Sequence, residues 1–332
     1  MRSIRLAAGL FFLAPLVAEF LLGNLPITAL STLVVLAPLY GGGALLIREV
    51  VRRTGRGWPA IVVLGVAYGV LEEGIASMSL FNPNYAGERL LDSGFIPALG
   101  MGGPWTVFVL TLHAIWSISV PIAIMEVFAG ERATRPWLGS VGLGVAALLF
   151  VAGLAASLAI SIFTYHFVAS VPQLAGTVVV AAALAAAGLT VGRPRRDSVG
   201  SAGSVGSAAR RAPSPWLVGG AALLASSIFK ELPRNTLGWI YVVVVLALAA
   251  GTWALVHRWS QQDGWGAAHR LALAAGAVCT YAWTAFPQQP MLPATPRQDL
   301  IGNVVFAAGA VALVAAAAWR LAHRTGSSPG LR

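Results

Sequence analysis

The chain has 332 residues, of which 57% are hydrophobic and only 10% are charged. A soluble domain is typically about a quarter charged, so this composition excludes an ordinary soluble enzyme and a disordered chain. The single cysteine, Cys279, excludes a disulfide scaffold and a cysteine-based metal site. The formal net charge is +10, but most of the arginines lie in short loops between apolar blocks. Membrane topology explains that distribution better than phosphate binding does, so no nucleic-acid partner is expected.

The apolar residues are grouped in blocks of about 20, the length that a helix needs to cross a bilayer. The sequence therefore predicts an all-α fold, a polytopic transmembrane helical bundle of about ten spans. The expected spans are 6–22, 27–47, 59–81, 104–128, 137–163, 173–191, 216–232, 237–256, 266–286 and 300–320. The seventh is the shortest, and a re-entrant segment there would reverse the topology of every later span.

The basic residues predict the orientation of the bundle, because Lys and Arg concentrate in cytoplasmic loops. With a cytoplasmic N-terminus, the outer segments hold only four of the 22 Lys and Arg residues, namely Arg89, Lys230, Arg234 and Arg297. This bias predicts a multi-pass protein of the cell (inner) membrane, with both termini in the cytoplasm and the lipid bilayer as a partner. The oligomeric state is left open.

One segment has the composition of a linker. Residues 192–215 lack aromatic side chains and carry SVGSA twice, at 198–202 and 204–208. Such Gly- and Ser-rich sequences are typical of flexible loops, and we expect this one on the cytoplasmic side. It divides the chain into a six-span membrane domain with a polar cavity, 1–191, and a four-span membrane domain, 216–332.

Ionisable side chains at membrane depth cost about 2.5–3.5 kcal/mol each on insertion scales, so they mark candidate functional sites. The third span holds the adjacent acids Glu72 and Glu73, about 20 Å from its cytoplasmic start at 1.5 Å per residue. The fourth span returns inward and brings His113 to nearly the same depth. Since antiparallel helices joined by a short loop are usually neighbours, one glutamate is expected within hydrogen-bonding distance of His113, in a cavity between these spans.

Two further residues are expected near this depth. Glu19 lies in the first span, and His166 follows the fifth span in an outer loop that could fold over the same cavity. The competing hypothesis is that these groups form a buried polar cluster that only fixes helix packing.

A Glu-Glu pair on a membrane helix followed by two histidines downstream resembles the CAAX-protease and bacteriocin-processing family (CPBP, ABI) of intramembrane proteases. That family carries Glu-Glu-x-x-x-Arg, Phe-x-x-x-His and His-x-x-x-Asn/Asp on successive membrane helices. Glu72 and Glu73 match the first motif, His113 the second, and His166 could match the third, within residues 59–190. Ser77 and Ser170 stand at the Arg and Asn/Asp positions. The resemblance implies that a glutamate and the histidines activate a water that attacks a peptide bond.

If the protein is an enzyme, we expect hydrolysis of a peptide or membrane-embedded substrate, with Glu72, Glu73, His113 and His166 as catalytic residues. One glutamate would be the general base, and His113 the proton partner or oxyanion donor. The sequence requires no cofactor. Glu and His side chains suit zinc, but their spacing matches no His-Glu-x-x-His pattern, so metal dependence is left open.

Two alternatives from other classes use the same residues. In a proton-coupled transporter or permease, the Glu/His cluster would be the proton-coupling site. In a non-catalytic membrane scaffold, it would only hold helices together. The sequence does not decide between these classes, and it does not name a substrate.

Overall fold

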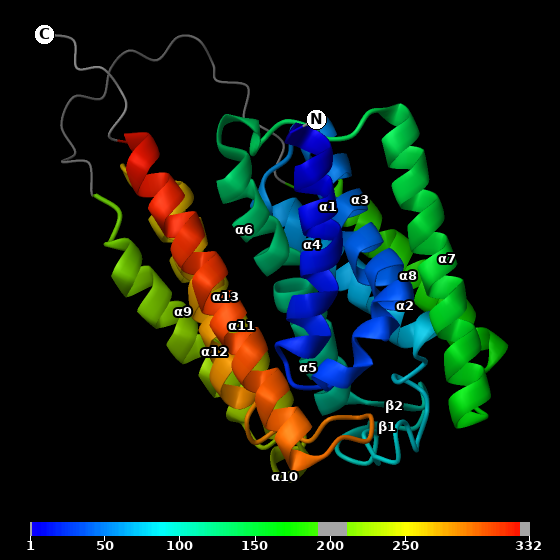
Figure 1. Ribbon diagram of the computed structural model, residues 1–332. Coiled ribbons are helices and arrows are strands. Elements are labelled where there is room, and N and C mark those ends of the chain that lie inside the picture. Colours follow the sequence, from blue (N-terminus) through cyan, green and yellow to red (C-terminus); the bar gives the residue numbers. More distant parts are fainter. Residues whose placement is uncertain (1, 192–210, 326–332) are drawn as a thin grey trace, which may run out of the picture.

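The computed structural model describes residues 2–191 and 211–325. Within them the chain is an all-α bundle with one short antiparallel hairpin (Figure 1). The α-helices are α1 (Arg2–Pro15), α2 (Leu33–Leu36), α3 (Gly42–Arg53), α4 (Trp58–Leu71), α5 (Gly103–Leu112), α6 (Val120–Ala129), α7 (Ser140–Tyr165), α8 (Val171–Gly188), α9 (Pro215–Glu231), α10 (Arg234–Leu237), α11 (Trp239–Ser260), α12 (Ala267–Thr284) and α13 (Pro296–Thr325). The strands are β1 (Phe95–Ile96) and β2 (Met101–Gly102), and the two 3₁₀ helices are η2 (Ile27–Thr32) and η6 (Gly130–Arg132).

Eight helical stretches of the described chain are long and apolar enough to cross a membrane. They are Ser3–Phe20, Ile27–Arg53, Trp58–Ala76, Gly103–Arg132, Ser140–Tyr165, Val171–Gly188, Trp239–Ser260 and Pro296–His323. The other two expected spans correspond to α9 and α12, helices of 17 and 18 residues. These two pack closely, since a Cβ on Gly276 of α12 would lie 2.5 Å from the carbonyl oxygen of Gly219 in α9.

The two halves of the chain lie on two sides of the bundle, with α1–α8 on one side and α9 and α11–α13 on the other (Figure 1). They share a hydrophobic core to which Trp116, Phe229 and Tyr281 all belong. Most of the predicted linker, residues 192–210, lies outside the described residues. The division at the linker therefore separates two groups of helices that pack against each other.

Both ends of the described chain lie at one end of the bundle, which we call the terminal end. There α1 begins and α13 finishes, opposite the hairpin formed by β1 and β2, which marks the hairpin end (Figure 1). That both termini lie on one side of the membrane, and that this side is the cytoplasm, stay predictions.

The described part of the chain contains four π-helical turns. Two of them lie between consecutive α-helices, η3 (Ala37–Gly41) and η5 (His113–Ser119), and two end the helices α1 and α4, η1 (Leu16–Phe20) and η4 (Glu72–Ala76). Prolines contribute to this, since Pro15 adjoins η1 and Pro38 lies in η3. Pro121, just after η5, has no N–H to donate to the carbonyl of Ser117. Short π-helical turns inside α-helices are rare and are often found at functional sites.

Glycines bring α4 unusually close to η5. A Cβ on Gly69 would lie 3.0 Å from the Cβ of His113, and a Cβ on Gly65 would lie 3.0 Å from the Cα of Ala114. The spacing of these glycines, four residues apart, places them on one face of α4, the arrangement that lets membrane helices touch backbone to backbone. This contact sets the acids at the end of α4 beside His113.

Candidate functional site

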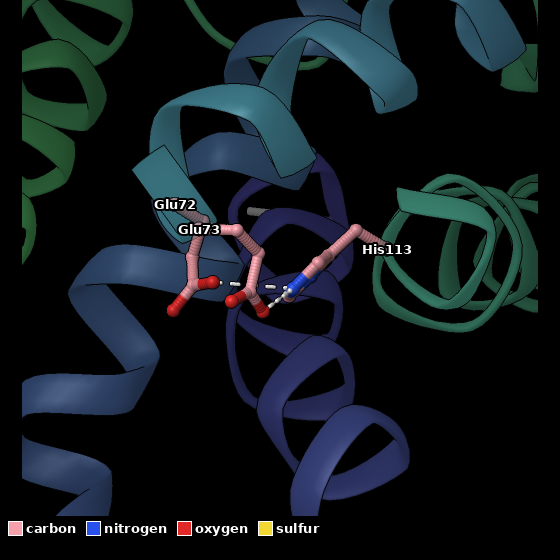
Figure 2. Close-up of side chains that lie close together, drawn as sticks. All are labelled: Glu72, Glu73 and His113. Atoms are coloured by element: carbon pink, nitrogen blue, oxygen red, sulfur yellow. Dashed lines mark hydrogen bonds and ion pairs between the residues drawn. The ribbon is translucent and has the colours of Figure 1, made fainter. Parts of the chain in front are cut away.

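The acids of η4 and the histidine of η5 meet in the interior of the bundle. The Nε2 atom of His113 lies 2.7 Å from Oε1 of Glu73 and 3.2 Å from Oε2 of Glu72 (Figure 2). All three side chains are buried, with 5–7% of their surface exposed. The expected hydrogen-bonding distance between a glutamate and His113 is therefore confirmed.

A turn after η4 holds the second oxygen of the Glu73 carboxylate. The hydroxyl of Ser77 donates to this oxygen at 2.9 Å, and the hydroxyl of Ser79 donates to it as well. Met78 between them has a φ of 54°, a left-handed conformation that is strained for a residue with a side chain. Because this conformation reverses the chain direction, the two flanking serines both reach back to one carboxylate. The indole N–H of Trp105 donates to Ser79 at 3.0 Å and extends the network.

His113 is held from three further directions. Its Nδ1 atom lies 3.1 Å from the hydroxyl of Ser117, one turn along the same segment. The ring of Tyr40 stacks over the imidazole with centroids 5.9 Å apart, and the ring of Tyr68 meets it edge-on at 5.6 Å. The imidazole therefore has a fixed orientation, with Nε2 directed at the carboxylates.

Glu19 joins the site through Tyr40, as its depth in the first span suggested. The hydroxyl of Tyr40 donates to one oxygen of Glu19, and the side-chain amide of Asn24 donates to the other at 3.1 Å. The carbonyl of Asn24 in turn accepts a hydrogen bond from the backbone N–H of Met291 at 2.8 Å. A loop of the C-terminal half thus reaches the edge of the site, although the ionisable groups all come from the N-terminal half.

Two buried polar atoms in this region have no hydrogen-bond partner: the hydroxyl of Tyr68 and Oε2 of Glu72. Tyr68 is 3% exposed and Glu72 is 6% exposed. Nε2 of His113 lies 3.2 Å from Oε2 of Glu72 and 2.7 Å from Oε1 of Glu73. Because a ring nitrogen carries at most one hydrogen, Nε2 can donate to only one of these oxygens, and the oxygen of Glu73 is the nearer one. An unsatisfied buried polar group costs about 1–3 kcal/mol, so such atoms call for an explanation.

The cluster is rich in acids and poor in bases. In the described part of the chain, no Lys or Arg forms an ion pair with Glu19, Glu72 or Glu73. The donor atoms of Glu72, Glu73 and His113 all lie within 4.8 Å of one another, a spacing compatible with a metal ion.

His166 is not brought to this cluster. It lies exposed at the end of α7, where its φ of 51° terminates the helix. Ser170, at the position of the family's Asn or Asp, forms a capping box with Gln173 at the start of α8. Ser77, at the position of the family's Arg, instead binds Glu73 directly. The Glu/His cluster therefore does not include His166.

Sequence reasoning missed Tyr40, Tyr68, Ser77 and Ser79 as neighbours of the acids. A signal for Tyr68 alone was available, because the Gly65–Gly69 spacing indicates a close helix contact on the face next to it. The serines depend on the strained turn at Met78, which has no sequence signature.

The structure also has an open pocket of about 470 Å³ at the hairpin end. It lies between the loop after α12 and the start of α13, and Phe286, Met291 and Asp299 are among its lining residues. The Glu/His cluster does not line it. Its polar groups Asp299 and Asn303 bind each other, at 3.3 Å.

Comparison with known proteins places the chain in a family. A model described as an uncharacterized membrane protein family matches residues 10–322, nearly the whole chain, so the protein belongs to that family. No curated protein and no solved structure matches it. Family membership agrees with the multi-pass membrane protein predicted from composition, and the family description names no activity.

Proposed function

We propose that this member of the membrane family is an intramembrane peptidase whose acid–base centre is the Glu72–Glu73–His113 cluster. One observation carries the proposal: a buried pair of adjacent carboxylates shares a single imidazole, and one carboxylate oxygen has no hydrogen-bond partner. A group that serves only helix packing is expected to have its hydrogen bonds satisfied within the protein. An acceptor left open beside an oriented imidazole suits the binding of a water or a substrate.

The two carboxylates have different surroundings, which suggest different roles. Glu73 is held by His113, Ser77 and Ser79, so it fixes and polarises the imidazole. Glu72 has the open oxygen, so it is the better general base. In the proposed reaction, a water oxygen attacks the peptide carbonyl carbon while a water proton passes to Glu72. His113 then relays this proton from Glu72 to the departing amine as the C–N bond breaks, which leaves a carboxylic acid and an amine and returns Glu72 to its starting state.

The unpartnered hydroxyl of Tyr68 supplies the remaining requirement of this chemistry. Attack on a carbonyl places negative charge on its oxygen, and a donor aimed at that oxygen stabilises the transition state. Tyr68 is buried beside the imidazole and has a free O–H to donate. The likeness to the CAAX proteases supports the same assignment of the glutamates and His113, although the second histidine of that family has no counterpart in the cluster.

The test compares peptide ends in membranes. A strain that lacks the chain is complemented with the wild type, Glu72→Gln or Glu88→Gln, and new peptide N-termini in the membrane fraction are mapped by mass spectrometry. Glu88 is an exposed carboxylate outside the site, so its variant controls for loss of charge alone. We expect N-termini that depend on the wild type and on Glu88→Gln, and that disappear with Glu72→Gln. Identical sets from wild type and Glu72→Gln would overturn the proposal.

One observation favours proton-coupled transport as a second candidate. Glu19, Tyr40, the Glu72–Glu73 pair and His113 each lie on a π-helical turn. Broken helices around buried acids near the middle of the membrane are a feature of secondary transporters. Proteoliposomes with an internal pH-sensitive dye distinguish the two functions. Proton uptake that Glu72→Gln abolishes, with no cleaved product, would favour transport, and loss of neither activity in that variant would leave a packing role.

A further inference from the structure

We infer that Glu72, Glu73 and His113 bind one divalent transition-metal ion, with zinc the ion that best fits the ligands. The inference deepens the proposed peptidase function, because it concerns the same site, but it rests on separate observations. These are the convergence of three donor atoms, the contacts that orient them, the charge of the cluster and the unpartnered carboxylate oxygen.

The donor atoms converge on one point. His113 Nε2 lies 2.7 Å from Glu73 Oε1 and 3.2 Å from Glu72 Oε2. In a four-coordinate zinc site, bonds of 2.0–2.2 Å place neighbouring donors about 3.3 Å apart. The observed spacing is therefore close to that of a metal site, and a small outward movement of the carboxylates accommodates the ion. Three protein ligands leave the fourth position to water, which is the arrangement of catalytic zinc sites.

The atoms that do not converge are held from outside. Nδ1 of His113 is bonded to Ser117, and the second oxygen of Glu73 accepts from Ser77 and Ser79. Metal-binding histidines and carboxylates commonly have such partners, which fix the ring orientation and the free oxygen. Here the outer contacts leave Nε2 and Oε1 directed inward, toward Glu72 (Figure 2).

The charge of the cluster also calls for a cation. Two carboxylates face one imidazole, with a third carboxyl group at Glu19 nearby and no paired Lys or Arg in the described ranges 2–191 and 211–325. A carboxylate in a low-dielectric interior is stable only when it takes up a proton or pairs with a cation, and one imidazole can pair with only one of the two carboxylates. A divalent cation balances Glu72 and Glu73, and it gives the unpartnered Oε2 of Glu72 a ligand. Carboxylate and imidazole ligands suit zinc, with manganese, iron and cobalt as weaker binders of the same class.

When bound, such an ion lowers the pKa of a coordinated water and polarises a carbonyl group, which is the chemistry that peptide hydrolysis needs. With an ion present, Glu72, Glu73 and His113 would be its ligands, so Glu72 and His113 would hold the metal in place of acting as general base and proton donor, and Tyr68 would remain free to donate to the substrate.

Metal content of the full chain tests the inference without any substrate. The protein is purified in detergent, its metals are measured by plasma mass spectrometry, and the chelated protein is titrated with Co²⁺ while visible absorption bands are recorded. We expect one metal ion per wild-type chain, and Co²⁺ bands that Zn²⁺ removes. Glu73→Gln should abolish binding. Glu88→Gln, which alters an exposed carboxylate outside the site, should leave it unchanged.

Two further variants keep the test valid if Glu73→Gln fails to fold. Ser117→Ala retains every ligand but loses the contact that orients His113, so Co²⁺ affinity should fall roughly 10–100-fold. In a Cys279→Ser background, His113→Cys replaces the imidazole ligand with a thiolate ligand. This variant should still bind Co²⁺, and its spectrum should show a thiolate charge-transfer band.

The outcomes separate this inference from the proposed function. A wild-type chain with no metal and no Co²⁺ bands, or equal Co²⁺ affinity in Ser117→Ala and wild type, overturns the metal site. If cleavage then still depends on Glu72, the peptidase proposal stands without a metal. Metal binding in a protein that generates no new peptide N-termini overturns the peptidase proposal alone.

Discussion

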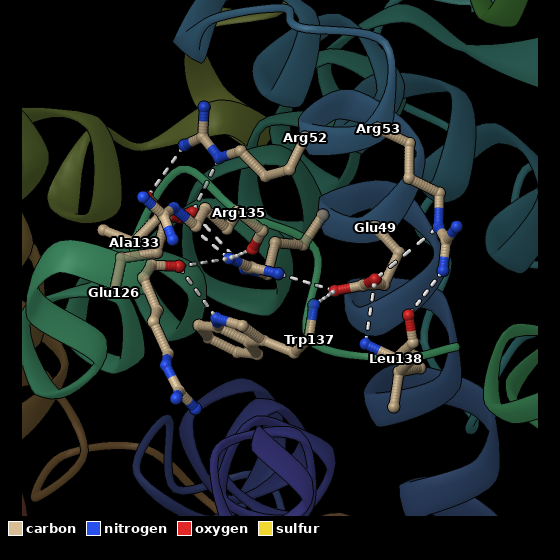
Figure 3. Close-up of polar contacts among 10 residues, drawn as sticks. Glu49, Arg52, Arg53, Glu126, Ala133, Arg135, Trp137 and Leu138 are labelled. Atoms are coloured by element: carbon tan, nitrogen blue, oxygen red, sulfur yellow. Dashed lines mark hydrogen bonds and ion pairs between the residues drawn. The ribbon is translucent and has the colours of Figure 1, made fainter. Parts of the chain in front are cut away.

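The bundle buries ionisable side chains at two places, and their partners differ. At the terminal end, Arg48, Arg52, Glu49 and Glu126 form a network in which acids and bases alternate (Figure 3). Toward the hairpin end, Glu72, Glu73 and His113 bring two acids to one imidazole (Figure 2). Both sets are buried to a similar degree.

The network at the terminal end pairs each buried charge with groups of opposite sign, and one of its atoms, Nε of Arg48, has no hydrogen-bond partner. Arg52 binds both oxygens of Glu126 at 2.7 Å, the paired geometry that Arg and carboxylate groups favour. Arg48 is fully buried, donates to Glu49 and to the carbonyls of Ala133 and Arg135, and lies 3.3 Å from the ring centre of Trp137. Its remaining Nε atom has no hydrogen-bond partner and lies 3.4 Å from a carboxylate oxygen of Glu126, an ion-pair contact. These contacts tie α3 to α6 and to the segment before α7.

The contrast teaches that burial alone does not identify a functional site. Charges that hold helices together have partners of opposite sign and nearly complete hydrogen bonding. Both sets contain a buried polar atom without a hydrogen-bond partner, so the Glu/His cluster is distinguished by its excess of acids, with two carboxylates on one imidazole. Each prediction below would break or sharpen that distinction, in order of decreasing expected effect.

Glu72→Gln gives the largest expected effect. Loss of a general base typically lowers activity roughly 10²–10⁴-fold, and the amide keeps the shape of the side chain. Cleavage measured on a substrate found by N-terminal mapping should fall by that factor, while the thermal unfolding midpoint in detergent stays near that of the wild type. A large loss of stability with unchanged cleavage would indicate that the cluster only holds helices together, as the network at the terminal end does.

Arg52→Met should instead lower the stability of the protein. It removes the cation that binds both oxygens of Glu126 and leaves that buried carboxylate only the longer contact with Arg48, at 3.4 Å. Loss of one partner of a buried ion pair costs about 3–5 kcal/mol. Chemical unfolding in mixed micelles should show that loss. The double variant Arg52→Met, Glu126→Met should recover much of it, because apolar replacements of a buried pair are often neutral. A double variant as unstable as the single one would contradict this account.

Tyr68→Phe should separate stability from activity. The hydroxyl has no partner, so its removal relieves a buried unsatisfied group and should raise the free energy of unfolding by about 1–3 kcal/mol. Cleavage should fall, because an oxyanion donor is lost. Tyr40→Phe is the matched comparison, since its hydroxyl is bonded to Glu19 and its removal should destabilise the protein. Equal stability effects at both positions would contradict the difference between the two hydroxyls.

The last prediction concerns the orientation of the two clusters in the membrane. Its test has the smallest expected effect on the protein, because it only labels exposed positions. In a Cys279→Ser background, Glu131→Cys at the terminal end and Gly87→Cys toward the hairpin end are treated with an impermeant maleimide in intact cells. The positive-inside bias predicts labelling at 87 and protection at 131. The reverse pattern would invert the bundle in the membrane.

Much of the fold could be predicted from sequence because membrane spans depend mainly on length and composition. The meeting of Glu73 with His113 could also be predicted, since equal depth on adjacent antiparallel helices leaves little choice of partner. Tyr40 could not be assigned, because π-helical turns rotate side chains away from the positions that regular helices give them.

His166 shows a different limit. Its distance from the cluster depends on where the chain turns after α7, and that turn uses a left-handed residue that sequence periodicity does not indicate. The short helices α9 and α12 show a third limit, because length and hydropathy alone do not decide whether such segments span the membrane.

Trp116 connects the site to helix α12 of the C-terminal half. Its indole N–H donates to the carbonyl of Ala277 at 2.8 Å, and its ring stacks flat on Tyr281 with centroids 4.5 Å apart. Trp116 lies three residues from His113 on the same π-helical turn, η5. Any sliding of α12 along the bundle would therefore displace Trp116 and, through the shared backbone of η5, the imidazole of His113.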